Sequence, residues 1–212
     1  MDLLKDISNN LQRGDDEKVA ALTGQAIAAK VPPKQILDDG LIAGMTVVGM
    51  KFKAHDIFLP DVLLAAKAMY AGLNLLKPLL VKEDIPAVGK VVLGSVEGDL
   101  HDIGKNLVGI MLKGAGFEII DLGNDVPPER FVDAAVKENA SVIGMSALLT
   151  TTMSNMKKVV DMVNERGLTD KIKTIVGGAP VTSEYAGEIG ADAYAFDGIS
   201  AVDRIKQLLG LS

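Results

Sequence analysis

The sequence contains no cysteine among its 212 residues and only two histidines, His55 and His101. Without cysteine, the chain can form no disulfide, Fe–S cluster, thiolate zinc site or cysteine nucleophile. The lack of disulfides is compatible with a reducing compartment, so we expect a cytoplasmic protein. Because there are only two histidines, any chemistry that depends on an imidazole has few candidate residues.

The sequence also lacks a basic cluster and a long apolar run. Its net charge is −6, whereas nucleic-acid-binding domains are usually basic, so we expect no nucleic-acid partner. No uninterrupted apolar run approaches the length of about 18 residues that a membrane span needs. Residues 1–5 lack the basic and then apolar layout of a signal peptide. We therefore expect neither membrane insertion nor secretion.

The first part of the chain, from residue 1 to about 81, has helical patterning and almost no strand signal. Gly14 ends a first helix, and Asp15 can cap the second. Pro33 can open a third helix as its first-turn residue, and a fourth begins near Pro60. Four helices joined by short loops predict a small antiparallel bundle.

The second part of the chain alternates between apolar, β-rich runs and helical stretches. Strands are predicted at 88–96, 117–122, 142–145, 172–176 and 193–196, and helices at about 103–115, 128–139, 152–166, 182–189 and 199–210. Strand–helix alternation predicts right-handed crossovers and a parallel sheet with helices on both faces. We expect an α/β fold: a four-helix bundle cap with a linker, residues 1–87, and a flavodoxin-like (Rossmann-like) five-stranded parallel sheet domain, residues 88–212. The linker at 82–87 is the expected hinge.

Ligands of such sheets bind at the carboxyl ends of the strands, and the loop after the first strand is dense in functional side chains. Asp99 lies two residues before His101, so its carboxylate can accept a hydrogen bond from one ring nitrogen. Three interpretations remain open: a structural residue at a helix start, a general acid–base pair, and a single-histidine metal ligand. A zinc site is disfavoured because further histidine or cysteine ligands at suitable spacing are missing.

Two further loops carry polar or small residues. Four hydroxyl residues follow the third strand, from Ser146 to Thr152. Thr151 or Thr152 can cap the next helix, but one cap needs one hydroxyl, so the run also suggests a polar ligand or a hydrogen-bond relay. After the fourth strand, Gly177 and Gly178 predict either an ordinary strand-to-helix turn or a close backbone approach to a bulky ligand.

The segment from Gly98 to Asn106 resembles the Asp-x-His-x-x-Gly signature of cobalamin-binding domains. Ser146-x-Leu148 and Gly177-Gly178 fall where that family has its downstream motifs, and Phe52 with Phe58-Leu59-Pro60 resembles the motif of its helical cap. The resemblance covers nearly the whole chain. It is strongest to the small corrinoid proteins of methanogen and acetogen methyltransferase systems, and the cobalamin module of methionine synthase is a longer-range relative.

The resemblance implies a cofactor, cobalamin as methylcobalamin or a related corrinoid, and a set of site residues. His101 would be the lower axial ligand of cobalt, replacing the cofactor's own dimethylbenzimidazole, and Asp99 and Thr152 would form a proton relay to it. The family often has Ser preceded by Pro where this chain has Thr152 preceded by Thr151. The residues implied in cofactor binding are Gly98, Asp99, His101, Asp102, Ile103, Gly104, Ser146, Leu148, Thr150, Gly177, Gly178, Tyr194, Gly198 and, from the cap, Phe52 and Leu59.

The function implied is that of a non-catalytic carrier subunit. It would shuttle a methyl group between a substrate:corrinoid methyltransferase and a second methyltransferase whose acceptor is tetrahydrofolate or coenzyme M, with a reductive activase as a further partner. A cobalamin-dependent sensor is the main alternative, and a subunit of an adenosylcobalamin-dependent radical mutase is a third. The choice of methyl donor would lie in the partner methyltransferase.

Overall fold

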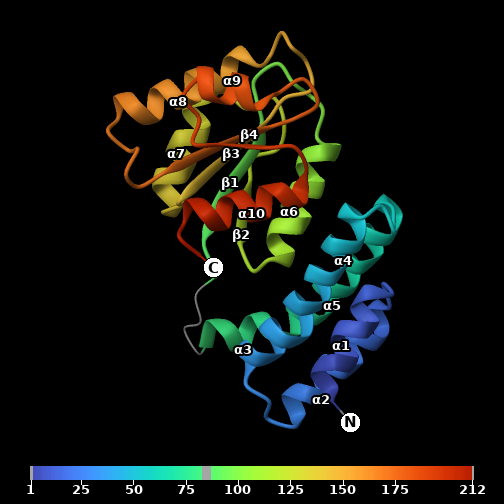
Figure 1. Cartoon of the computed structure of the whole chain (residues 1–212). Coiled ribbons are helices and arrows are strands. Elements are labelled where there is room, and N and C mark those ends of the chain that lie inside the picture. The colour runs from blue at the N-terminus through green and yellow to red at the C-terminus, as the bar shows by residue number, and fades with distance from the viewer. Residues whose placement is uncertain (1, 83–86, 212) are drawn as a thin grey trace. The chain divides into compact units, whose positions relative to one another are not determined.

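The computed structural model describes residues 2–82 and 87–211, so most of the predicted hinge at 82–87 lies outside the described residues. The chain forms two compact units (Figure 1). One contains Met1–Ala87 with Gly114–Gly116, and the other contains Val88–Lys113 with Phe117–Ser212.

The first unit is helical, as predicted. Asp15 caps the second helix by accepting a hydrogen bond from the backbone N–H of Lys18 at 2.9 Å, and Gly14 adopts a φ of +72° before it. The helical elements are α1 (Leu3–Gln12), α2 (Asp16–Ala28), α3 (Pro33–Gln35), the π-helical η1 (Ile36–Ile42), α4 (Ala43–Lys53) and α5 (Leu59–Lys82).

The predicted third helix is one continuous helical stretch, but it contains the π-helical segment η1, which the sequence pattern did not reveal. In a π-helix the hydrogen bond joins residues five apart, so Ile36 and Leu41 face the same side of the helix. Both are fully buried. A Cβ atom on Gly40 would lie 3.2 Å from the side chain of Ile7, so this segment packs closely against α1.

Helix α5 supplies one side of the helical core. Its buried hydrophobic side chains are Val62, Ala65, Ala66, Ala68, Met69 and Leu76, and the helix packs against α2. By length and composition alone, Leu59–Leu80 could cross a membrane. The core helix of a globular protein passes the same test, so this is weak support for a membrane span.

The second unit is built on a five-stranded parallel sheet, as predicted, and its strand order, β2-β1-β3-β4-β5, is that of a flavodoxin-like fold. Its strands are β1 (Lys90–Ser95), β2 (Glu118–Asp121), β3 (Val142–Ser146), β4 (Lys173–Gly177) and β5 (Ala193–Ala195). Its helices are α6 (Ile103–Gly114), α7 (Pro128–Glu138), α8 (Ser154–Glu165), α9 (Ser183–Glu188) and α10 (Gly198–Leu208).

Helices cover both faces of this sheet, and for that reason its central strands are largely apolar. Val92, Ile143 and Val176 belong to a core cluster that includes residues of α7, α8 and α9. Helices α6 and α10 cover the opposite face (Figure 1). The sheet is close-packed: a Cβ atom on Gly94 would lie 2.8 Å from the ring of Phe131 in α7.

The strand register places four strand ends side by side. Ser95 at the end of β1 pairs with Ser146 of β3, which pairs with Gly177 of β4, which pairs with Ala195 of β5. The loops that follow these strands therefore meet at one edge of the sheet.

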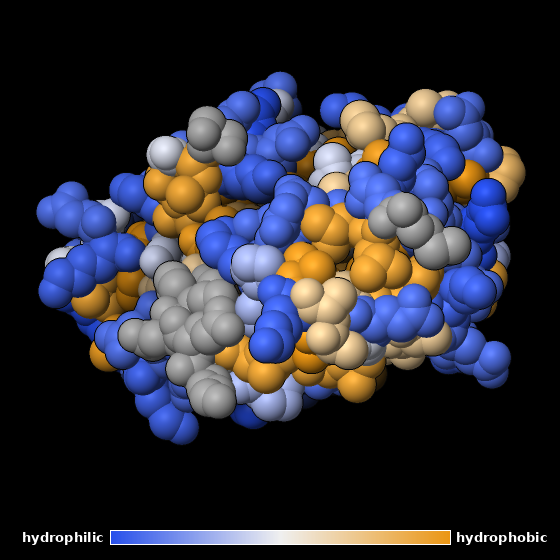
Figure 2. Space-filling model, turned by 90° about the horizontal axis from the view of Figure 1, so that it is seen from below, coloured by the Kyte–Doolittle hydropathy of each residue, from blue (hydrophilic) through white to orange (hydrophobic). Residues whose placement is uncertain are grey.

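The surface view in Figure 2 is mostly hydrophilic, with hydrophobic residues gathered in patches between the charged ones. Large exposed hydrophobic side chains occur in both units. In the helical unit they include Met50, Phe58, Leu63, Leu64 and Leu75, and in the sheet unit they include Leu100, Ile103, Leu148, Leu149 and Phe196.

Candidate cofactor-binding site

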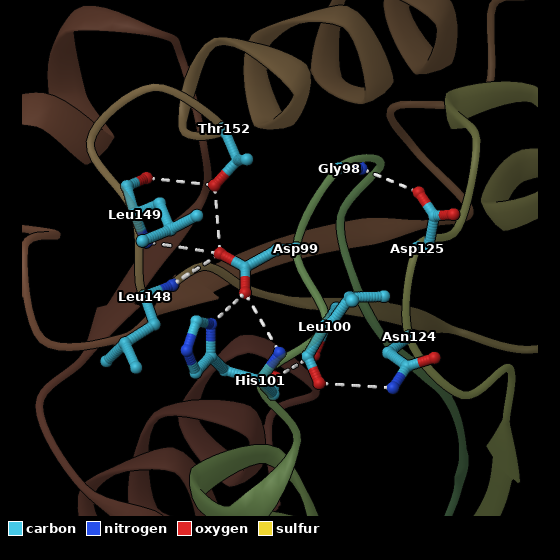
Figure 3. Close-up of polar contacts among 10 residues, drawn as sticks. Gly98, Asp99, Leu100, His101, Asn124, Asp125, Leu148, Leu149 and Thr152 are labelled. Carbon is cyan, nitrogen blue, oxygen red and sulfur yellow. Dashed lines mark hydrogen bonds and ion pairs between the residues drawn. The ribbon is translucent and has the colours of Figure 1, made fainter.

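A buried carboxylate, that of Asp99, organises the site at this edge of the sheet (Figure 3). Its Oδ1 atom lies 2.9 Å from Nδ1 of His101 and accepts a hydrogen bond from the His101 backbone N–H at 3.1 Å. Its Oδ2 atom accepts hydrogen bonds from the backbone N–H groups of Leu148 (2.7 Å) and Leu149 (3.1 Å) and from the Thr152 hydroxyl (2.9 Å). The predicted contacts of Asp99 with His101 and Thr152 are therefore present.

These hydrogen bonds determine the charge of Asp99. Burial raises the pKa of this carboxyl, but the hydrogen bonds from Leu148, His101 and Thr152 outweigh burial and hold the pKa well below its usual range. The group is therefore a carboxylate at neutral pH. It accepts the proton of Nδ1, so the Nε2 atom of a neutral His101 ring keeps a free electron pair.

The histidine ring combines a fixed side and an open side. About half of the side chain, 51%, is exposed, whereas Asp99 is fully buried. Among the residues that the structure describes, none forms a hydrogen bond with Nε2. The backbone is held as well, because the buried Ser95 hydroxyl donates to the His101 carbonyl at 2.7 Å. The arrangement offers one oriented nitrogen donor to a ligand.

Thr152 is turned toward Asp99 and does not cap a helix. Helix α8 begins at Ser154, and its N-cap residue, Met153, makes no side-chain cap. The predicted capping role of Thr151 or Thr152 is therefore wrong. The Thr152 hydroxyl is instead 2.9 Å from two acceptors, Asp99 Oδ2 and the Leu149 carbonyl oxygen, and it has only one proton to donate.

The glycines after β4 are required by contacts within the protein. A Cβ atom on Gly178, whose φ is +127°, would overlap the carbonyl oxygen of Ala147, and one on Gly177 would lie 2.7 Å from the carbonyl oxygen of Ala195. Close approach of the backbone is thus present, but to neighbouring loops and strands. A role of these glycines in binding a ligand stays a prediction.

The remaining predicted residues divide between the two units. Phe52 in α4 and Leu59 in α5 are half-buried in the helical unit, so their contact with the same cofactor stays a prediction. The other residues lie in the sheet unit, where Gly98 and Asp102 flank the Asp99–His101 pair and Ile103 and Gly104 begin α6. Ser146 ends β3, and Thr150 is exposed in the loop that follows. Tyr194 is half-buried in β5, and Gly198 is buried at the start of α10.

Sequence reasoning missed the loop after β2. Asn124 donates a hydrogen bond to the Leu100 carbonyl at 3.1 Å, and Asp125 accepts one from the Gly98 N–H at 2.7 Å. Both residues lie in a Gly-Asn-Asp segment, which is ordinary turn composition and gave no functional signal.

A second missed feature is the buried ammonium of Lys105, which is only 2% exposed. Its Nζ atom donates to Asp121 Oδ1 at 2.6 Å and to Asn106 Oδ1 at 2.7 Å. Burial raises the pKa of Asp121, but the bonds from Lys105 and from the Gly123 N–H bring it below its ordinary value. Asn106 in turn donates to Asp102 at 3.1 Å, so the network ties the start of α6 to the end of β2.

The donor set fits a metal that is already held by a large ring. Among the described residues, no group of three or more His, Asp or Glu side chains could hold a bare metal ion. A metal in a macrocycle needs only an axial donor, which His101 can supply. The side chains of Leu100, Ile103, Leu148 and Leu149 are exposed and therefore free to contact an apolar ring. A Cβ atom on Gly104 would meet no protein atom, which leaves open space at the start of α6.

The chain matches known cobalamin-binding families and corrinoid proteins. Two family models, each described as a B12 binding domain, match residues 89–206 and 3–77. The dimethylamine corrinoid protein of Methanosarcina barkeri is 43% identical over 209 residues, which cover 98% of this chain and 98% of that protein.

Solved structures agree with both the fold and the family. A chain in the crystal structure of the methanol:cobalamin methyltransferase complex from Methanosarcina barkeri is 33% identical, with a TM-score of 0.87, and the match covers 99% of this chain and 80% of that chain. A cobalamin-binding protein from Desulfitobacterium hafniense is 30% identical, with a TM-score of 0.80 and 98% of each chain covered. The chain therefore belongs to the B12-binding family, as one of the corrinoid proteins of methyltransferase systems, and its cofactor is cobalamin or a related corrinoid.

Proposed function

We propose that this protein is a methyl carrier that binds its corrinoid with the dimethylbenzimidazole base displaced and His101 in its place. When bound, the corrinoid supplies a cobalt atom that accepts and releases a methyl group. The observation that carries the proposal is the His101 ring, whose Nδ1 atom lies 2.9 Å from a buried carboxylate while the side chain is half exposed. A neutral imidazole oriented in this way is a strong axial donor.

Asp99 and Thr152 form the proposed proton relay. While Asp99 is ionised, it accepts from both the His101 ring and the Thr152 hydroxyl. If Asp99 takes up a proton when His101 leaves the metal, Thr152 can turn its own proton to the Leu149 carbonyl, also 2.9 Å away, and accept from Asp99. The two acceptors around one hydroxyl thus let the same side chains serve both protonation states.

Other residues bind and shield the cofactor in this proposal. The start of α6 and the loops after β3, β4 and β5 hold the ring and the displaced nucleotide tail. The residues proposed for this are Gly98, Asp102, Ile103, Gly104, Ser146, Leu148, Thr150, Gly177, Gly178, Tyr194 and Gly198. Phe52 and Leu59, in the bundle cap of residues 1–87, exclude water from the upper face.

The proposed partners follow from the names of the relatives. These are corrinoid proteins for dimethylamine and trimethylamine and a methanol:cobalamin methyltransferase complex. We therefore infer a substrate-specific methyltransferase as the donor partner and a second methyltransferase, with tetrahydrofolate or coenzyme M as acceptor, as the other. A reductive activase and a cytoplasmic location complete the proposal.

The experiment compares His101→Ala with His55→Asn after reconstitution with cobalamin. His55 is the other histidine, is exposed and has a φ of +60°, which Asn tolerates. We expect the wild-type protein and His55→Asn to show the absorption spectrum of histidine-coordinated, base-off cobalamin, and His101→Ala to lose it. An unchanged spectrum in His101→Ala contradicts the ligand assignment.

A turnover measurement then separates a carrier from a sensor. The reconstituted protein is incubated with a donor methyltransferase and its substrate, and methylation of the bound corrinoid is followed spectroscopically. We expect methylation, and demethylation on adding the acceptor methyltransferase. Cobalamin binding without transfer in either direction, over a panel of donor systems, contradicts the carrier and favours the sensor.

A further inference from the structure

Three consecutive residues of the loop that carries His101 are bonded to the loop after β2 (Figure 3). The Gly98 N–H donates to Asp125 Oδ1 at 2.7 Å. The Asp125 N–H donates to the Asp99 carbonyl oxygen at 3.0 Å. The Asn124 side-chain amide donates to the Leu100 carbonyl oxygen at 3.1 Å. Asn124 and Asp125 therefore hold the backbone of this loop residue by residue.

The loop after β2 is itself anchored on β1. The Ser95 N–H donates to the Gly123 carbonyl at 3.0 Å, and the Val126 N–H donates to the Ser95 carbonyl at 3.1 Å. Val96 and Val126 form a parallel β-bridge. Asn124 and Asp125 thus lie between two residues that extend the pairing of the sheet, which makes them a rigid support.

Asp125 has an unusual backbone conformation for this purpose. Its φ is +52°, a left-handed conformation that costs a non-glycine residue free energy but that Asp and Asn tolerate best. In this conformation its N–H contacts the Asp99 carbonyl while its carboxylate contacts the Gly98 N–H. The strained conformation of Asp125 thus accompanies two hydrogen bonds, one with Gly98 and one with Asp99, which are adjacent residues of the His101 loop.

Asp99 is consequently held from two sides. The loop after β3 binds its carboxylate through Leu148, Leu149 and Thr152, and Asp125 binds its backbone. The orientation of the His101 ring depends on the position of Asp99, because Nδ1 is hydrogen-bonded to Asp99 Oδ1. A shift of the Asp99 backbone would therefore change the direction of the Nε2 electron pair.

We propose that Asn124 and Asp125 are positioning residues that set the orientation of the His101 ring for axial coordination. They act through the backbone of residues 98–100 and need not touch the cofactor. The inference rests on the ligand role proposed for His101, but its effect on the ring is measurable without cofactor.

The test compares Asp125→Gly, which permits the left-handed backbone but removes the acceptor, with Asp125→Asn, which keeps both an oxygen acceptor and the tolerance for positive φ. Asn139→Gly is the matched control, because Asn139 has the same φ of +52° at the end of α7, away from the site. Asn124→Asp, at an exposed residue, removes the amide donor to the Leu100 carbonyl. It therefore tests independently whether the loop after β2 positions the backbone of residues 98–100.

Two measurements are made. In the cofactor-free protein, we expect the NMR signals of the His101 ring to shift in Asp125→Gly and Asn124→Asp, and to match the wild type in Asp125→Asn and Asn139→Gly. After reconstitution, the absorption spectrum reports the equilibrium between coordinated and uncoordinated His101. In Asp125→Gly and Asn124→Asp we expect this equilibrium to move about fivefold toward the uncoordinated form, the size expected for one lost hydrogen bond. Asp125→Asn should restore coordination.

The outcomes separate the two proposals. Wild-type ring signals and a wild-type spectrum in both Asp125→Gly and Asn124→Asp overturn the positioning role. A wild-type protein that binds cobalamin without histidine coordination contradicts the proposed function, and the ring signals of the cofactor-free variants then decide the positioning role alone.

Discussion

The Nδ1 atom of His101 lies 2.9 Å from Oδ1 of Asp99, yet the two side chains have opposite environments: Asp99 is fully buried and 51% of His101 is exposed. The acceptor is thus removed from water while the opposite nitrogen of the ring can meet a ligand. This separation lets the protein orient the imidazole from inside its core and offer its donor atom outside.

The first prediction concerns acid stability. The pKa of Asp99 is depressed in the folded protein relative to its unfolded value of about 3.9, so the unfolded chain binds this proton more tightly. The stabilisation is therefore fully present above that value and is lost as the pH falls toward the folded pKa. We expect Asp99→Asn to be less stable than wild type at pH 7 but to lose less stability between about pH 5 and 3.

Denaturant unfolding over this pH range measures the effect. Asp170→Asn, at an exposed turn position after α8, is the control, and its free energy of unfolding should change with pH with the same slope as that of the wild type. Equal slopes for wild type and Asp99→Asn would contradict the argument.

The second prediction concerns the buried hydroxyl of Thr152. Thr152→Ala leaves Asp99 Oδ2 with one donor fewer, and we expect the free energy of unfolding to fall by about 1–2 kcal/mol. Thr152→Ser keeps the hydroxyl and should retain most of this stability, whereas Thr151→Ala, at an exposed neighbour, should have little effect. Chemical denaturation at neutral pH measures all three. If Ser and Ala at position 152 destabilise equally, the hydroxyl is not the stabilising group.

The third prediction concerns the open space beside Gly104. A Cβ atom would meet no protein atom at Gly104 in α6 or at Gly187 in α9, so neither Gly→Ala change should destabilise the fold. Only Gly104 lies in the segment that carries His101, three residues after it, and we expect Gly104→Ala to weaken cobalamin binding about tenfold by crowding the corrin ring. Gly187→Ala should bind normally. Titration of the cofactor-free proteins with cobalamin, together with thermal unfolding, provides both readouts, and equal affinities would show that the space is not used.

The fourth prediction concerns the asymmetric ion pair between Lys105 and Asp121, whose side chains are 1% and 46% exposed. Lys105→Met leaves a carboxylate that water can solvate, so we expect a loss of about 1 kcal/mol. Asp121→Ala leaves a buried ammonium without its charged partner and also removes the acceptor of the Gly123 N–H, so we expect a loss of about 2–4 kcal/mol. Urea unfolding of the two variants measures both losses, and the reverse order would show that burial does not govern this pair.

Local patterns sufficed to predict much of this protein. The sheet followed from short apolar runs, because parallel strands covered on both faces need no polar alternation. The bond between Asp99 and His101 followed from a spacing of two residues, and the Asp15 cap followed from its place between a glycine and an apolar helix. The resemblance to cobalamin-binding domains also came from a motif that is continuous in the chain.

Only the tertiary structure identified the other partners of this motif. Leu148 binds Asp99 across 49 residues and Asp125 binds Gly98 across 27, and both contacts depend on which strand ends lie side by side. The overlap that makes glycine necessary at position 178 involves the backbone of Ala147. The π-helical segment at 36–42 packs closely against α1, which is distant in the sequence pattern that defines each helix. Propensities and hydrophobic periodicity act within a few residues, whereas these contacts arise only when the strands pair in register.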